Sequence, residues 1–128
     1  MSNVFDIATR RPIDGDPREA PRPGECVICF VRRMVAARGC TGALPWVERW
    51  RLARARRATA LVDRLRRRGA ACDCAVVGGL WTISAALWVP DPLTGELTEP
   101  TEVPDCPGVR PNSTQACELW VDLHRLAL

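Results

Sequence analysis

Seven cysteines in 128 residues are the side chains of this sequence best suited to chemistry. Four of them form close pairs, because Cys26 and Cys29 make a C-x-x-C and Cys72 and Cys74 make a C-x-C. Zinc takes four ligands at the corners of a tetrahedron, with each thiolate sulfur about 2.3 Å from the ion. Two such pairs, about 40 residues apart, predict one zinc site. Cys72 and Cys74 are the first candidate ligands, Cys26 and Cys29 follow, and Cys40 competes with them.

The geometry of this zinc site depends on two predicted helical segments. If the residues after Cys29 are helical, Cys29 and Cys40 lie 11 residues apart, or roughly 16 Å along the axis, and they do not share an ion. If residues 45–69 form one long antiparallel helix, its end brings the C-x-C to the C-x-x-C. If that helix is broken near Arg56, its end returns to Cys40 instead. The C-x-x-C is then free to join Cys106 and Cys117 around a second ion.

The elements that must position these cysteines are predicted from hydrophobic spacing. Apolar residues recur at helical spacing from Cys26 to Gly39. A second helical segment, or two short ones meeting at the turn 54–57, covers residues 45–69. Short strands are expected at 75–77, 80–89 and 96–98, followed by a C-terminal helix from residue 116. The fold class is therefore α+β, with two or three helices, a small antiparallel sheet and a C-terminal helix.

Composition limits the classes of protein to consider. The 18 basic residues are all arginines, and His124 is the one histidine, which excludes lysine-dependent and histidine-rich catalytic sites. Residues 1–25 are rich in proline, glycine and charge and predict a mobile arm before one domain over 26–128. The longest apolar-leaning run, 75–89, is shorter than the ~20 residues of a membrane span. We therefore expect a cytoplasmic protein with reduced thiols and no membrane partner.

Charge is distributed unevenly and suggests an alternative function. Residues 45–69 carry nine arginines and two acids, whereas residues 70–128 carry two arginines and eight acids. A basic helical segment can neutralise the phosphates of a nucleic acid. The competing interpretation is that the acidic residues of 70–128 neutralise these arginines within the protein. The candidate nucleic-acid contacts are the arginines of this segment: Arg49, Arg54, Arg56, Arg57, Arg64, Arg67 and Arg68.

Enzymatic roles are less well supported than a binding role. A C-x-x-C at a helix N-terminus can take part in disulfide exchange, but Pro21, Pro23 and Gly24 precede it where a thioredoxin-like site needs a strand. Ligation by cysteines alone is typical of structural zinc. The sequence thus favours a small zinc-stabilised module that binds a protein partner, and leaves the question of an enzyme open.

The residues around the C-x-C resemble a known family. The stretch 69–77, G-A-A-C-D-C-A-V-V, is similar to the G-G-x-C-D-C-E-hydrophobic signature of an uncharacterised bacterial family, domain of unknown function 2695. Stretch 40–45 stands where shorter members have C-D-H-T-L-R, with Gly42 replacing the histidine and, downstream, Ala75 replacing the glutamate. Longer members from high-GC bacteria share the C-x-x-C and a motif matching 108–117, so the resemblance covers about residues 24–120. It implies a small metal-binding domain, with Cys26 or Cys29 as replacements for the missing histidine.

Overall fold

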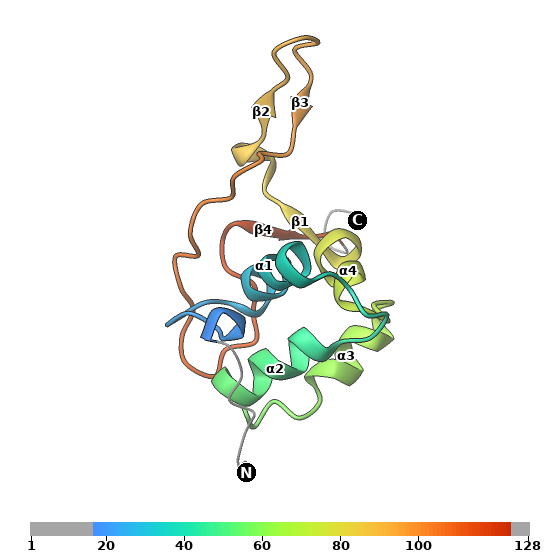
Figure 1. The fold of residues 1–128 in the computed structure, drawn as a ribbon, viewed down its shortest axis with the longest axis vertical. Coiled ribbons are helices and arrows are strands. Elements are labelled where there is room, and N and C mark those ends of the chain that lie inside the picture. The colour runs from blue at the N-terminus through green and yellow to red at the C-terminus, as the bar shows by residue number, and fades with distance from the viewer. Residues whose placement is uncertain (1–16, 124–128) are drawn as a thin grey trace.

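The computed structural model describes residues 17–123, and their helices precede two small antiparallel ladders (Figure 1). This arrangement confirms the predicted α+β class. The elements, in chain order, are η1 (Pro17–Glu19), α1 (Val27–Arg38), α2 (Pro45–Arg54), α3 (Leu61–Arg67), α4 (Asp73–Ala75), the π-helical turn η2 (Val76–Leu80), β1 (Trp81–Ile83), η3 (Ala85–Leu87), β2 (Val89–Pro90), β3 (Leu97–Thr98) and β4 (Trp120–Asp122).

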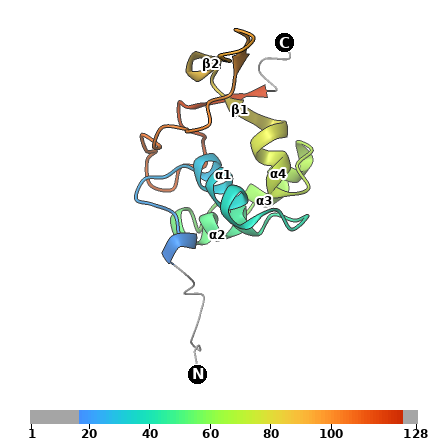
Figure 2. The ribbon, with the colours of Figure 1, turned by 45° about the horizontal axis from the view of Figure 1, so that its top comes forward.

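Helix α1 forms the centre of the domain (Figure 2). Val27, Phe30, Val31 and Met34 recur at helical spacing and are buried, which places one face of α1 in the core. The helix ends at Gly39, whose φ of 85° lies in the left-handed region that glycine tolerates. The predicted helix from Cys26 to Gly39 is therefore confirmed. Its two ends lie next to different groups of cysteines, as described below.

The second helical segment is broken, as in the second of the two predicted geometries. Pro45 occupies the first turn of α2, where its missing N–H costs nothing. The chain turns between residues 55 and 60, where Ala55 is only 1% exposed, and α3 begins at Leu61. Trp50 of α2 and Leu65 of α3 are both buried in the same core as α1.

The predicted strand at 75–77 is wrong. These residues lie in α4 and η2, and Val76 is fully buried. A run of three apolar residues fits a buried helical turn as well as a strand, so periodicity did not distinguish them. The region 80–89 contains β1 and the start of β2, separated by η3, and the predicted strand at 96–98 pairs with β2 as β3.

The two ladders have different surroundings. Strand β1 pairs with β4, with Ile83 opposite Trp120, and this pair lies against the helical core. Strands β2 and β3 form a hairpin that projects from the body (Figure 1). In the predicted C-terminal helix, residues 120–122 are strand β4 instead, because they complete the β1 ladder. Leu123 is helical, and the remainder of that prediction lies outside the described residues.

The arm predicted for residues 1–25 is described only from Pro17 onward. There, Glu19 contacts both Arg38 and Arg49, at 3.0 and 2.9 Å. Glu25 is 4% exposed and accepts two hydrogen bonds from the guanidinium of Arg33. Within residues 17–123, no helix has the length and apolar character that a membrane span requires.

Candidate metal centres

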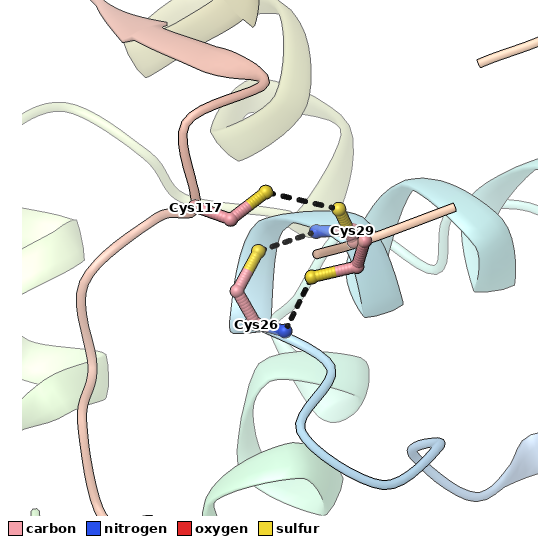
Figure 3. Close-up of side chains that lie close together, drawn as sticks. Cys26, Cys29 and Cys117 are labelled. Carbon is pink, nitrogen blue, oxygen red and sulfur yellow. Dashed lines mark hydrogen bonds between the residues drawn. The ribbon is translucent and has the colours of Figure 1, made fainter. Parts of the chain in front are cut away.

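Four cysteines meet at the N-terminal end of α1. Cys26, Cys29, Cys106 and Cys117, here called the four-cysteine cluster, have sulfur atoms within 4.8 Å of one another. The first two come from the start of α1, and the last two come from the long loop between β3 and β4. In Figure 3 the sulfur of Cys117 faces that of Cys29 at the start of α1. Cys26 and Cys117 are buried, and the other two are half-buried. None of the four forms a disulfide.

The spacing of these sulfurs suits a tetrahedral ion. Four sulfurs about 2.3 Å from a zinc ion are separated from one another by about 3.8 Å. The Cys29 and Cys117 sulfurs are 3.6 Å apart. A set of four thiolates leaves no coordination position open, which is the pattern of a structural site.

Hydrogen-bond donors surround the four-cysteine cluster. The N–H of Cys29 donates to the sulfur of Cys26 at 3.3 Å, and the N–H of Cys26 donates to the sulfur of Cys106 at 3.3 Å. The indole N–H of Trp120 donates to the sulfur of Cys29 at 3.2 Å. Such donors, together with the positive end of the α1 dipole, stabilise negative charge on sulfur. They therefore favour the thiolate form that a metal requires.

The short distances between the sulfurs shift the pKa values of the thiols in the four-cysteine cluster. Hydrogen bonds from the thiol and the backbone N–H of Cys29 lower the pKa of Cys26 to about 5, against burial. The same shared proton, with burial, raises the pKa of Cys29 above its usual range. Burial also raises the pKa of Cys117 to about 12. A divalent ion bound by these sulfurs would displace their protons.

The loop that supplies Cys106 runs beside the segment that enters α1. The N–H of Val109 donates to the carbonyl of Gly24 at 2.8 Å, and Gly24 lies against Gly108, with a φ of 75° and 102° respectively. The indole N–H of Trp50 donates to the carbonyl of Glu25 at 2.9 Å. These contacts fix both chain segments where the four sulfurs meet.

Three further cysteines meet beyond the opposite end of α1. Cys40, Cys72 and Cys74, here called the three-cysteine cluster, also have sulfurs within 4.8 Å of one another. Cys40 follows the end of α1, while Cys72 and Cys74 flank the first residue of α4. Cys40 and Cys74 are exposed, and Cys72 is half-buried. This cluster is thus smaller and more open to solvent than the four-cysteine cluster.

Asp73 holds the C-x-C against the loop that follows Cys40. Its side chain is fully buried and accepts hydrogen bonds from the N–H groups of Trp46 and Val47, at 3.2 and 3.3 Å. Its own N–H donates to the carbonyl of Ala43 at 2.9 Å. Because Leu44 provides no side-chain cap for α2, Asp73 acts as the cap from a distant part of the chain. Burial raises the pKa of Asp73, and the two N–H donors oppose that shift.

The thiols of the three-cysteine cluster also differ in acidity. The N–H of Gly42 and the thiol of Cys74 lower the pKa of Cys40 to about 7. Sharing that proton, together with some burial, raises the pKa of Cys74 to about 11. A Cβ atom added at Gly42 would meet nothing within 4 Å, so this glycine leaves open space beside Cys40. Among residues 17–123 no fourth donor joins these three sulfurs, and Gly42 stands where the resemblance places a histidine.

Of the two groupings of cysteines that the sequence allowed, the structure shows the one that follows from a broken second helix. Cys72 and Cys74 meet Cys40, and the C-x-x-C meets Cys106 and Cys117. The two clusters lie at opposite ends of α1, so the five predicted ligands do not surround one point. The supporting roles of Asp73 and Trp120 had not been predicted, because both depend on contacts between residues far apart in the chain.

The arginines proposed as nucleic-acid contacts are spread over α2, the turn 55–60, α3 and its C-cap residue Arg68, and several have partners within the protein. Arg49 pairs with Glu19 and lies over the ring of Trp46. Arg68 pairs with Asp122 at 2.6 Å and lies over the ring of Trp81. Of the other five, Arg56 donates a hydrogen bond to the carbonyl of Leu52 and Arg64 donates one to the hydroxyl of Thr114. Arg54 is half-buried, and Arg57 and Arg67 are exposed.

Comparison with known proteins supports the resemblance seen around the C-x-C. Residues 27–78 match the model of the family described as "Protein of unknown function (DUF2695)". Over these residues the chain is similar to that family. The matched residues, fewer than half of the chain, include all of the three-cysteine cluster but only Cys29 of the four-cysteine cluster. No curated protein and no solved structure matches the chain. The match over 27–78 therefore indicates no activity, and the two cysteine clusters, either of which could hold a metal ion, are the distinctive chemistry of the described residues.

Proposed function

We propose that this protein is a small zinc-stabilised interaction module, with its structural zinc ion in the four-cysteine cluster. The observation that carries the proposal is the convergence of four sulfurs, three of them accepting N–H hydrogen bonds, from segments about 80 residues apart. Zinc fits this donor set better than calcium or magnesium, which prefer oxygen ligands. Thiolate ligands persist in a reducing environment, which supports a cytoplasmic location.

The structural role of this zinc follows from the loop it would clamp. Residues 99–119 contain no helix or strand, yet they supply two of the four sulfurs and lead into β4. A domain of this size has little core to spare for anchoring such a loop. An ion that binds only the folded state stabilises it by about 4 kcal/mol when the free ion exceeds its dissociation constant 1,000-fold. Zinc would therefore supply stability that the apolar core does not.

The β2–β3 hairpin is the surface we assign to a partner. Leu93 is 94% exposed at its tip and Leu97 is 59% exposed, although large apolar side chains are usually buried. Residues 89–105 carry five acids and no arginine. Exposed apolar side chains on an acidic segment fit a protein partner whose surface combines apolar and basic residues. Replacing Leu93 and Leu97 with serine should leave the melting temperature unchanged, and a lower melting temperature would assign these side chains to the fold instead.

Nucleic-acid binding is the alternative that the arginines of 49–68 raise. Nothing in the described residues favours it, since Arg49 and Arg68 have acidic partners and the hairpin would repel phosphate. Absence of binding to duplex and single-stranded DNA and RNA at low salt would dismiss it. Salt-sensitive binding that is lost on substitution of Arg57 and Arg67 would instead overturn the assignment to a protein partner.

Native mass spectrometry of the reduced chain tests the zinc proposal. We expect the mass increment of zinc in the wild type, and loss of the tightly held ion in Cys117→Ser. Cys40→Ser is the matched control, because it makes the same change in the other cluster and should retain that ion. Chelation should lower the melting temperature of wild type and of Cys40→Ser. Metal-free protein with an unchanged melting temperature would overturn the proposal.

A further inference from the structure

We infer that the partner of the β2–β3 hairpin is a second copy of this chain, which receives the tip of the hairpin in an apolar hollow between α2 and α3. This inference deepens the proposed function and rests on its assignment of the hairpin to a protein partner, but not on the zinc ion. It names one occupant for two exposed surfaces, because each surface is complementary to the other in polarity and in charge.

The hollow lies between the loop that follows Cys40, the start of α2 and the face of α3. Its volume is about 570 Å³, which is comparable with that of a pocket for a small ligand. Its lining includes the apolar side chains of Ala43, Pro45 and Val62. Ala43 and Pro45 are exposed, and Val62 is half-buried. The hollow thus presents apolar side chains to solvent, where an apolar group from another molecule can cover them.

The segment that forms most of the hollow is strongly basic. Residues 45–69 carry nine arginines and only two acids. Arg66 lines the hollow, and its side chain is 57% exposed although it lies 4.0 Å from Asp63. Glu48 also lines the hollow, but it is paired with Arg51 at 2.6 Å. The surface therefore combines apolar side chains with an excess of positive charge, which are the two properties that the hairpin requires of a partner.

The hairpin carries the opposite charge and two exposed leucines. Residues 89–105 have five acids and no arginine. Leu93 at the tip is 94% exposed, and Leu97 on β3 is 59% exposed. The carboxylate of Asp91 accepts hydrogen bonds from the N–H groups of Leu93 and Thr94, at 2.7 and 3.2 Å. Because these bonds already order the tip, its insertion into a hollow costs less conformational entropy than that of a flexible loop.

The hairpin and the hollow of one chain lie too far apart to meet each other. In Figure 1 the hairpin projects from one end of the long axis, whereas α2 and α3 lie at the other end. Figure 2 shows the same separation. The contact therefore joins two copies, with the hairpin of one against the hollow of the other, which is a heterologous interface. Charge favours this pairing and opposes contact between two acidic hairpins.

Sedimentation velocity of the reduced full chain tests this inference at concentrations up to about 1 mM, which reaches weak specific complexes. The reductant prevents the exposed thiols of Cys40 and Cys74 from cross-linking copies. The wild type should associate as its concentration rises and dissociate as salt is added, because salt screens exposed charges. Leu93→Ser should weaken the association by roughly 10- to 100-fold, the effect of losing one buried leucine.

Arg66→Glu tests the other surface, because it places a negative charge in the hollow. It should weaken the association by about 10-fold. Arg110→Glu is the matched control, since it makes the same change at an exposed residue that does not line the hollow. A mixture of Leu93→Ser and Arg66→Glu should recover association, because the first variant keeps an intact hollow and the second an intact hairpin. The melting temperatures of all three variants should match that of the wild type.

Other outcomes overturn the inference. A chain that stays monomeric over this range would exclude a second copy as the partner, and would leave both the zinc ion and a different protein partner as proposed. Association that persists in Leu93→Ser, or that Arg110→Glu weakens as much as Arg66→Glu does, would assign the contact to another surface. A mixture of the two variants that fails to associate would refute the pairing of hairpin and hollow. Association of a chain that proves to be metal-free would support this contact and overturn only the zinc ion.

Discussion

Asp73→Ala should cost about 3 kcal/mol of folding free energy, although it removes no core apolar group. The carboxylate is fully buried and accepts the N–H groups of Trp46 and Val47 at the start of α2. Loss of a helix cap costs roughly 0.5–2 kcal/mol. A buried donor left without a partner costs a further 1–3 kcal/mol or so. For a domain of this size, a loss of about 3 kcal/mol lowers the melting temperature by roughly 12 °C.

Asp73→Asn is a partial control, because its single amide oxygen can accept only one of the two hydrogen bonds that now go to different carboxylate oxygens. The amide NH2 then faces the other N–H donor and leaves it unpaired, so we expect a loss of about 2 kcal/mol, smaller than that of Asp73→Ala. Urea and thermal unfolding of the metal-free and zinc-loaded chains measure both effects. With zinc present, Asp73→Ala should also weaken binding at the three-cysteine cluster by roughly 10–100-fold. Equal stability of Asp73→Ala and wild type would refute the capping role, and equal losses in both variants would assign the effect to charge.

Three further predictions address other contacts. Trp120→Phe removes the indole N–H from a sulfur of the four-cysteine cluster and should weaken metal binding there by about 10-fold, measured by competition with a chelator; unchanged affinity would exclude a role for that hydrogen bond. Glu25→Gln breaks the ion pair with Arg33, whose side chain is a quarter exposed, and should lower the free energy of unfolding in urea by about 2 kcal/mol. An unchanged free energy of unfolding would mean that the ion pair is no more favourable than the hydrogen bonds of the separated groups to water. Arg51 lowers the pKa of Glu48, so this pair stabilises the fold above the usual glutamate pKa and loses that contribution as the pH falls through the lowered pKa. At acid pH, the melting temperature should therefore fall less steeply with decreasing pH in Glu48→Gln than in the wild type. An identical dependence of the melting temperature on pH would contradict the pairing.

The sequence alone indicated the chemistry and several of the elements. Cysteine pairs, the helix from Cys26 to Gly39 and the pairing of 96–98 were all predictable because each depends on residues close together in the chain. The resemblance around the C-x-C, which the family match over 27–78 supports, also rests on a local motif. Local periodicity gave the wrong secondary structure for 75–77 and 120–122. A short apolar run fits either a helix or a strand, and its contacts with neighbouring elements decide between the two.

Tertiary structure decided which cysteines meet. Two partitions of the cysteines were compatible with the sequence, and the choice depended on whether residues 45–69 form one helix or two. The turn at 55–60 settles it, since burying Ala55 and ending α2 there sends α3 and the C-x-C back to Cys40. Asp73 then ties the C-x-C to α2, and the loop 99–119 is left to bring Cys106 and Cys117 to the other end of α1. Such contacts join residues from 26 to about 90 positions apart, and the free energy that selects them comes from burial and hydrogen bonding across the whole domain, which no local pattern encodes.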